Sequence, residues 1–185
     1  MEITELLQRQ RKVYVDFFQE QISNCKGSSE LLLESKIEEP EEYYRLYRFD
    51  CIKRKEADFE IIEFNNDAYI NHKPIYYHFD ELQIEINPFF WNGCEIDLYG
   101  EIANWGIFIE WVKEWIEDDS DKGHENGSLS YKIHNFQKPR IELDKIVLAI
   151  DLGTVATDAL IQLIRIIEHS GIKKMRIHSD EMLKN

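Results

Sequence analysis

Two carboxylates spaced two residues apart, Glu95 and Asp97, are the first residues of this 185-residue chain that could do chemistry. Alternate residues of a β-strand point to the same side, so both carboxylates should share one face, with Cβ atoms roughly 6–7 Å apart. Such a pair can act as general acid and base, or bind a cation. No nucleophile, oxyanion loop or third polar group accompanies them in the sequence. We therefore expect no catalytic residue, and an enzyme based on this pair stays an alternative.

A second candidate is the tetrapeptide Asp151-Leu152-Gly153-Thr154, which follows an apolar run at 146–150. It resembles the first phosphate loop of the actin and sugar-kinase ATPases, which would imply nucleotide binding. In that family the loop joins two strands and a long nucleotide domain follows, whereas here a helical pattern follows at once. We interpret the segment as a strand-to-helix turn, with Thr154 or Thr157 capping the helix. Asp151 also ends a central strand, where ligands of open sheets bind, so it is a second catalytic alternative.

Four potential metal ligands lie close together in the sequence, namely His72, His78, Asp80 and Glu81. On a strand, His78 and Asp80 would share one face while Glu81 points to the other, which leaves no third ligand. We interpret them as exposed residues of an edge strand and expect neither a metal nor a cofactor.

The negative charge of the chain is concentrated in residues 56–131. This stretch holds 18 of the 36 acidic residues but three of the 22 basic ones. It also holds all four tryptophans and 15 of the 23 aromatic residues (4 Trp, 9 Tyr and 10 Phe). A field of one sign repels nucleic acid and anionic lipid, because both bind to basic patches. The same field attracts a basic protein, and aromatic side chains supply contact area for it.

Residues 82–99 read as a hairpin with one acidic and aromatic face. Asn92-Gly93 is typical of a two-residue type I′ turn, whose central residues need a positive φ. Pro88 would lie at a bulge or an edge, since proline cannot donate to the ladder. The apolar face would comprise Phe89, Trp91, Cys94, Ile96 and Leu98. The opposite, solvated face would comprise Glu85, Phe90, Glu95, Asp97 and Tyr99.

A helix capped by Asn104 should follow and run to about Asp118. Trp111 lies off its apolar stripe and is flanked by Glu110 and Glu114, so we expect Trp111 on the surface. The stripe itself would comprise Trp105, Phe108, Val112 and Trp115.

The remaining pattern indicates an α+β fold. An amphipathic helix is expected from about Thr4 to Ser23. A strand at 146–150, a helix closed by Gly171 and a last strand around Met175 should form a right-handed strand–helix–strand unit with a parallel neighbour. We predict a single domain with one mixed sheet of about seven strands and about three helices mainly on one face. Its parts are a helical N-terminal extension (1–40), the acidic centre (56–131) and the strand–helix–strand unit (139–180).

These observations favour a binding protein over an enzyme. We expect the acidic, aromatic surface to neutralise a basic protein, and the physical model is an immunity protein that inhibits a bacterial nuclease-type toxin. A DNA-mimic inhibitor from a mobile element, an acidic assembly subunit and the small enzyme remain alternatives. The residues expected to contact the partner are Glu85, Phe90, Glu95, Asp97, Tyr99, Glu110, Trp111 and Glu114.

The expected location is the cytoplasm, with no membrane partner. No apolar run approaches the roughly 20 residues that span a bilayer. Residues 1–5 lack the basic start and apolar stretch of a secretory signal. Cys25, Cys51 and Cys94 are odd in number and far apart, which suits a reducing compartment and no zinc site. The sequence leaves the oligomeric state open.

Overall fold

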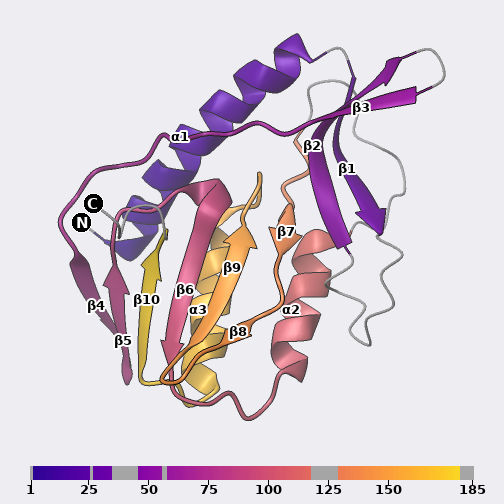
Figure 1. Ribbon diagram of the computed structural model, residues 1–185. Helices are drawn as coiled ribbons and strands as arrows, with labels where there is room; N and C mark the ends of the chain where they lie inside the picture. The colour runs from indigo at the N-terminus through magenta and orange to yellow at the C-terminus, as the bar shows by residue number, and fades with distance from the viewer. Residues whose placement is uncertain (1, 26, 35–45, 56–57, 118–128, 180–185) are drawn as a thin grey trace.

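Among the described residues, one mixed sheet of ten strands organises the fold, and three α-helices pack against one of its faces (Figure 1). The structure is a computed structural model that describes residues 2–25, 27–34, 46–55, 58–117 and 129–179. The helices are α1 (Ile3–Asn24), α2 (Gly106–Ile116) and α3 (Thr157–His169). The strands are β1 (Ser28–Glu34), β2 (Leu46–Lys55), β3 (Asp58–Ile62), β4 (Ile75–Phe79), β5 (Leu82–Ile86), β6 (Cys94–Tyr99), β7 (Asn135–Phe136), β8 (Arg140–Ile141), β9 (Ile146–Asp151) and β10 (Lys174–His178). The α+β prediction is confirmed, with more strands than the seven expected.

The C-terminal strand–helix–strand unit is inserted into the sheet. The strand order is β1-β2-β7-β9-β6-β10-β5-β4, with β3 also on β2 and β8 also on β9. β10 runs parallel to β5 and antiparallel to β6, and β6 runs antiparallel to β9. β9 and β10 are therefore parallel to each other, but β6 lies between them. Gly171 has a φ of 89°, as predicted for a left-handed helix cap.

The predicted hairpin over residues 82–99 is wrong, because β10 separates β5 from β6. Residues Trp91–Gly93 form a 3-10 turn (η2), and Gly93 is not among the residues with positive φ. The chain is held here by the end of β10. The Asn87 amide donates to the Ile177 carbonyl, and the Phe90 amide donates to Ser179 Oγ. These long-range hydrogen bonds outweigh the local turn preference of Asn92-Gly93.

The core lies between the sheet and the helices, and its residues match the expected apolar faces. The five residues assigned to the apolar face of 82–99 are all buried, namely Phe89, Trp91, Cys94, Ile96 and Leu98. The amphipathic helix expected near the N-terminus is α1, and its apolar positions Leu7, Tyr14, Phe18 and Ile22 are buried too. The N-terminal extension is not only helical, because β1 joins the sheet. The parts of it at 35–40, and the predicted helix end at Asp118, lie outside the described residues.

Two of the three cysteines are joined, contrary to the expectation from their spacing. A disulfide links Cys25, directly after α1, to Cys51 in β2, and Cys94 is free and buried. Disulfides persist in oxidising compartments, so the cysteine content no longer favours a reducing one. In the described part of the chain, no helix combines the length and the apolar character needed to cross a membrane.

Candidate functional site

The face of the sheet opposite the helices, called the open face here, carries a row of acids that are internally paired. This acidic row consists of Glu85, Glu95 and Asp97. The registers of β5, β10 and β6 place Arg176 between Glu85 and Asp97. Arg176 Nε lies 3.3 Å from Glu85 Oε1, and Arg176 Nη1 lies 3.9 Å from Asp97 Oδ2. The row is thus not the unpaired negative field that the sequence suggested.

Asp97 is the most enclosed member of the acidic row, with 1 % of its surface exposed. Its carboxylate lies 3.0 Å from Lys145 Nζ and 3.3 Å from His178 Nε2. Burial alone would raise the pKa of Asp97, but His178 and Lys145 hold that pKa below its usual value. Glu95 Oε1 is similarly paired with Arg140 Nη2 at 2.9 Å. Both carboxylates of the Glu95/Asp97 pair are thus engaged by cations of the same chain, so the geometry does not favour this pair as general acid and base.

The prediction that Trp111 lies on the surface is wrong. Trp111 is 2 % exposed, and its indole Nε1 donates to the Ala159 carbonyl of α3 at 3.0 Å. Its ring also packs against Phe136 of β7. Since α2 is covered by both the sheet and α3, its buried face is wider than one apolar stripe.

The other predicted contact residues are accessible, but they do not form one patch. Glu110 and Glu114 are exposed on α2, which packs on the helical side. Tyr99 is half-buried on the open face, and Lys174 Nζ lies 4.8 Å from its ring centroid. Phe90 is half-buried and makes an edge contact with Tyr69, with ring centroids 5.6 Å apart. Of these residues, Phe90 and Glu95 line the same cavity.

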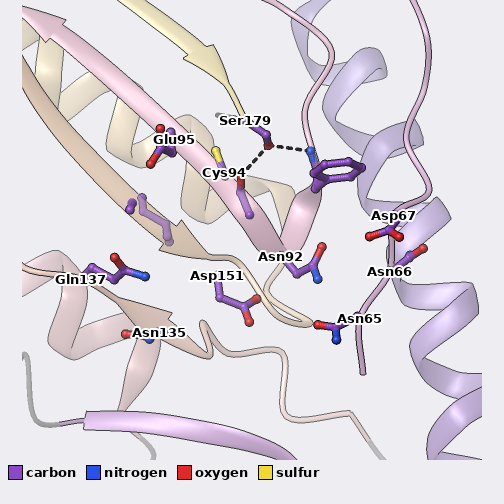
Figure 2. Close-up of a pocket in the computed structure, with 14 residues that line it drawn as sticks. Asn65, Asn66, Asp67, Asn92, Cys94, Glu95, Asn135, Gln137, Asp151 and Ser179 are labelled. Atoms are coloured by element: carbon purple, nitrogen blue, oxygen red, sulfur yellow. Dashed lines mark hydrogen bonds between the residues drawn. The ribbon is translucent and has the colours of Figure 1, made fainter. Parts of the chain in front are cut away.

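That cavity, called the hollow here, opens beside the end of β9 and has a volume of about 640 Å³ (Figure 2). Its lining includes three acids and five carboxamides, and none of its 14 described lining residues is basic. In Figure 2, Asp151 and Asn92 lie near the centre, between the 65–67 segment and the Asn135 and Gln137 side chains. The polar lining residues are Asn65, Asn66, Asp67, Asn92, Glu95, Asn135, Gln137, Asp151 and Ser179.

Strand register explains why this space is open and polar. Glu95 of β6 is directly opposite Ala149 of β9, and the Gln137 amide donates to the Ala149 carbonyl. Asn135 of β7 is directly opposite Asp151, so these two side chains share a face. Ala149 is thus a small residue surrounded by longer polar side chains, and its short side chain leaves space at the bottom of the hollow.

Three polar atoms of residues that line the hollow are buried without a hydrogen-bond partner among the described residues. They are Asn66 Nδ2, Asn92 Oδ1 and Glu95 Oε2. Asn66 is 6 % exposed, and its other amide atom accepts from the Ala68 backbone. Leaving a buried polar group unpaired costs about 1–3 kcal/mol, so native proteins rarely keep such atoms without a purpose. Other described residues outside the hollow also have such atoms, Asp97 and His178 among them, but the hollow combines three of them with open space, which makes it the candidate site.

A buried imidazole between two carboxylates lies behind the hollow. His134 Nε2 is 2.9 Å from Glu30 Oε1, and His134 Nδ1 is 2.9 Å from Asp50 Oδ1. We call these three residues the imidazole cluster. Burial would lower the pKa of His134, but Asp50 and Glu30 raise it to about 10, so the ring is a cation. Glu30 and His134 are 104 residues apart in the sequence, so no local pattern could indicate the cluster.

The tetrapeptide at 151–154 forms a turn between β9 and α3, as predicted, and it contacts the imidazole cluster. Gly153 has a φ of 51°, and a β-carbon there would collide with the His134 ring. The Gly153 amide donates to Asp151 Oδ1 at 2.9 Å. Thr154 Oγ1 donates to Glu30 Oε1 at 2.5 Å. The prediction that Thr154 or Thr157 caps α3 is wrong, since α3 begins without a side-chain cap.

Two carboxyl groups near the cluster have raised pKa values. Burial raises the pKa of Asp151 to about 6, with Asp50 acting in the same direction and His134 against it. Partial burial raises the pKa of Glu63 to about 7, and the charges of Asp50 and Asp151 add to this. The cluster and the hollow therefore share one crowded set of negative charges, of which Asp151 is the member that lines the hollow.

Metal binding finds no support within the described ranges, where no group of three or more His, Cys, Asp or Glu side chains is placed to hold an ion. Asparagine is a common turn residue, and Asn92-Gly93 was predicted to be a turn, so the asparagines gave no sequence signal for the hollow. No family model, curated protein or solved structure matches this chain.

Proposed function

We propose that the protein is a binding module that neutralises a basic protein, and that the hollow is the centre of the contact. The observation that carries this proposal is the lining of the hollow, which has three acids, five carboxamides and no basic residue among those described. A net charge of −14 would add long-range attraction for a basic partner. An immunity protein against a bacterial nuclease-type toxin remains the physical model, because the clefts of such toxins are basic.

The acidic row plays a different part in this proposal. Its carboxylates already have cationic partners in the same chain, so a foreign cation would have to displace Arg176, Lys145 or Arg140. The hollow has no such competitor among the residues that line it. We therefore place the main contact at Asp151, with Phe90 as an apolar wall.

A second candidate function is a small enzyme that uses Asp151 to move a proton. The pKa of about 6 brings this carboxyl close to neutral pH, where a general acid or base works best. Asp151 also lines a cavity large enough for a small substrate. The binding function has the wider support, since no nucleophile is found among the described lining residues apart from Ser179 and the buried Cys94. Ser179 is itself engaged with the Phe90 amide and the Gly93 carbonyl.

The proposal is tested by capture from the native host, identification by mass spectrometry and titration of the purified captured protein. We expect a lysine- and arginine-rich protein whose activity is inhibited by the wild type. Asp151→Lys should abolish inhibition, whereas Glu101→Lys, an exposed position beyond the far end of β6 with the same change of charge, should preserve it. The association rate should fall about tenfold or more from low to high salt. An acidic partner, or equal inhibition by Asp151→Lys, would exclude the proposal.

A further inference from the structure

We infer that the hollow is a receptor for the guanidinium group of an arginine side chain that the basic partner presents. This inference rests on the proposed function and names the chemical group that the hollow takes. It is carried by the unpaired polar atoms of the lining residues and by the absence of a basic residue among those described there.

Two of the three unpaired atoms are hydrogen-bond acceptors. Asn92 Oδ1 comes from the 3-10 turn before β6. Glu95 Oε2 comes from β6 itself, and the other oxygen of this carboxylate is held by Arg140. Asp151 adds a carboxylate from the end of β9, one oxygen of which is engaged by the Gly153 amide. A ligand that satisfies this set must carry several donors and a positive charge.

The distribution of these acceptors favours a guanidinium over an ammonium. They come from the 3-10 turn, β6 and β9, so one compact point charge would serve them less well than a flat group with five donors. Phe90 also lines the hollow, and its edge contact with Tyr69 holds the ring. Guanidinium groups stack on aromatic faces, whereas ammonium groups remain more strongly hydrated.

The third unpaired atom indicates that the guanidinium belongs to a peptide. Asn66 Nδ2 is a donor, and a guanidinium has no acceptor for it. A backbone carbonyl of the partner segment would supply that acceptor. Asn66 lies in the 65–67 segment, which borders the hollow opposite Asn135 and Gln137 (Figure 2). A segment that enters past 65–67 could thus place its backbone near Asn66 and its side chain near Asp151.

The test uses Nα-acetyl-arginine amide as the probe, followed in ¹H–¹⁵N spectra through the side-chain amides of Asn66, Asn92 and Asn135. The matched probes are the citrulline derivative, which keeps the shape without the charge, and the lysine derivative. We expect saturable shifts with the arginine probe and affinity at least about tenfold weaker for the other two. Equal binding of the citrulline probe, or shifts confined to α2, would overturn the inference.

Two variants test the geometry while keeping the fold. Asp151→Asn retains the oxygen that accepts from Gly153 and removes the charge, so arginine binding should weaken at least about tenfold. Ala149→Leu fills the floor of the hollow and should abolish binding. Glu101→Gln, at an exposed position beyond the far end of β6, is the control for loss of one negative charge and should bind as the wild type does. The backbone spectrum of each variant verifies folding, and unchanged binding in a folded Asp151→Asn would contradict the inference.

The outcomes separate this inference from the proposed function. If the arginine probe does not bind, yet Asp151→Lys abolishes inhibition of a basic partner, the guanidinium assignment is wrong and the function stands. If the probe binds in the hollow but no basic protein does, the function is wrong and the inference of a partner's arginine falls with it.

Discussion

The acidic row and the hollow lie on the same face of the sheet and share Glu95, but Asp97 in the row and Asp151 in the hollow have opposite surroundings. In the acidic row, Asp97 is 1 % exposed and lies within 4 Å of three basic side chains. In the hollow, Asp151 is surrounded by carboxamides, and the described lining contains no basic residue. The high density of acids in the sequence therefore led to the prediction of a contact surface at carboxylates that are already paired with basic side chains of the same chain. The cations beside Asp97, rather than the number of acids, separate the acidic row from the hollow, whose described lining offers Asp151 no basic side chain.

The largest effect is expected behind the hollow, at His134. His134→Leu would leave Glu30 and Asp50 buried without the cation between them, and breaking a buried pair costs about 3–5 kcal/mol. We expect the free energy of unfolding, measured in urea, to fall by this amount. A loss below about 1 kcal/mol would mean that the imidazole cluster does not support the hollow.

Reduction of the disulfide should produce the next largest loss. Cys25 and Cys51 are 26 residues apart, and closing a loop of that size stabilises a fold by roughly 3 kcal/mol. The urea midpoint should therefore fall when a reductant is added, and the double variant Cys25→Ser/Cys51→Ser should not respond to it. Hydrogen exchange should rise most in β1 and β2, which carry Glu30 and Asp50, and least in the strands of the acidic row. A uniform rise would contradict the separation of the two regions.

The acidic row itself is tested by a matched pair of substitutions. Asp97→Asn removes a buried charge that faces Lys145 and His178, so we expect a loss of about 2 kcal/mol at neutral pH. Asp67→Asn, at the rim of the hollow, should stay within about 0.5 kcal/mol because Asp67 is exposed. The folded pKa of Asp97 is lowered, so its contribution is complete at neutral pH. The difference between wild type and Asp97→Asn should then shrink only in acid. Equal stability of the two variants would erase the contrast between row and hollow.

The smallest effect on stability concerns Glu63, whose ionisation destabilises the folded protein. Its pKa is raised to about 7 in the folded state, so the folded protein binds this proton more tightly than the unfolded chain does. Stability should therefore decrease as the pH rises from about 4.5 to about 7. Glu63→Gln should be more stable than the wild type by roughly 1 kcal/mol at about pH 8, because water screens much of the repulsion. The two should be equal near about pH 4, and Glu110→Gln, the control, should match the wild type throughout. A destabilised Glu63→Gln at high pH would show that the group is not crowded by Asp50 and Asp151.

Local patterns in the sequence predicted the elements better than their pairing. The periodicity of α1 and the burial of Phe89, Trp91 and Ile96 follow from side-chain spacing, and the structure has them as expected. The prediction of a type I′ turn at Asn92-Gly93 was wrong. The 3-10 turn found there follows a segment that is hydrogen-bonded to Ile177 and Ser179, which are more than 80 residues away in the sequence. The prediction that Trp111 is exposed was wrong for a similar reason. Its indole donates to a carbonyl of α3 that is 48 residues away in the sequence.

By itself, the sequence determined an acidic α+β protein whose helices and apolar faces follow local periodicity. Tertiary structure alone decided which carboxylates are neutralised and which are left open. Glu30 and His134 are 104 residues apart, and Asp97 and Lys145 are 48 residues apart, yet each pair is in contact. The hollow likewise depends on strand order. β10 pairs with β6, and hydrogen bonds from Asn87 and Phe90 to Ile177 and Ser179 hold the 87–93 segment at the end of β10. The physical reason is that charge pairing depends on distance in space, which strand order sets and residue spacing does not.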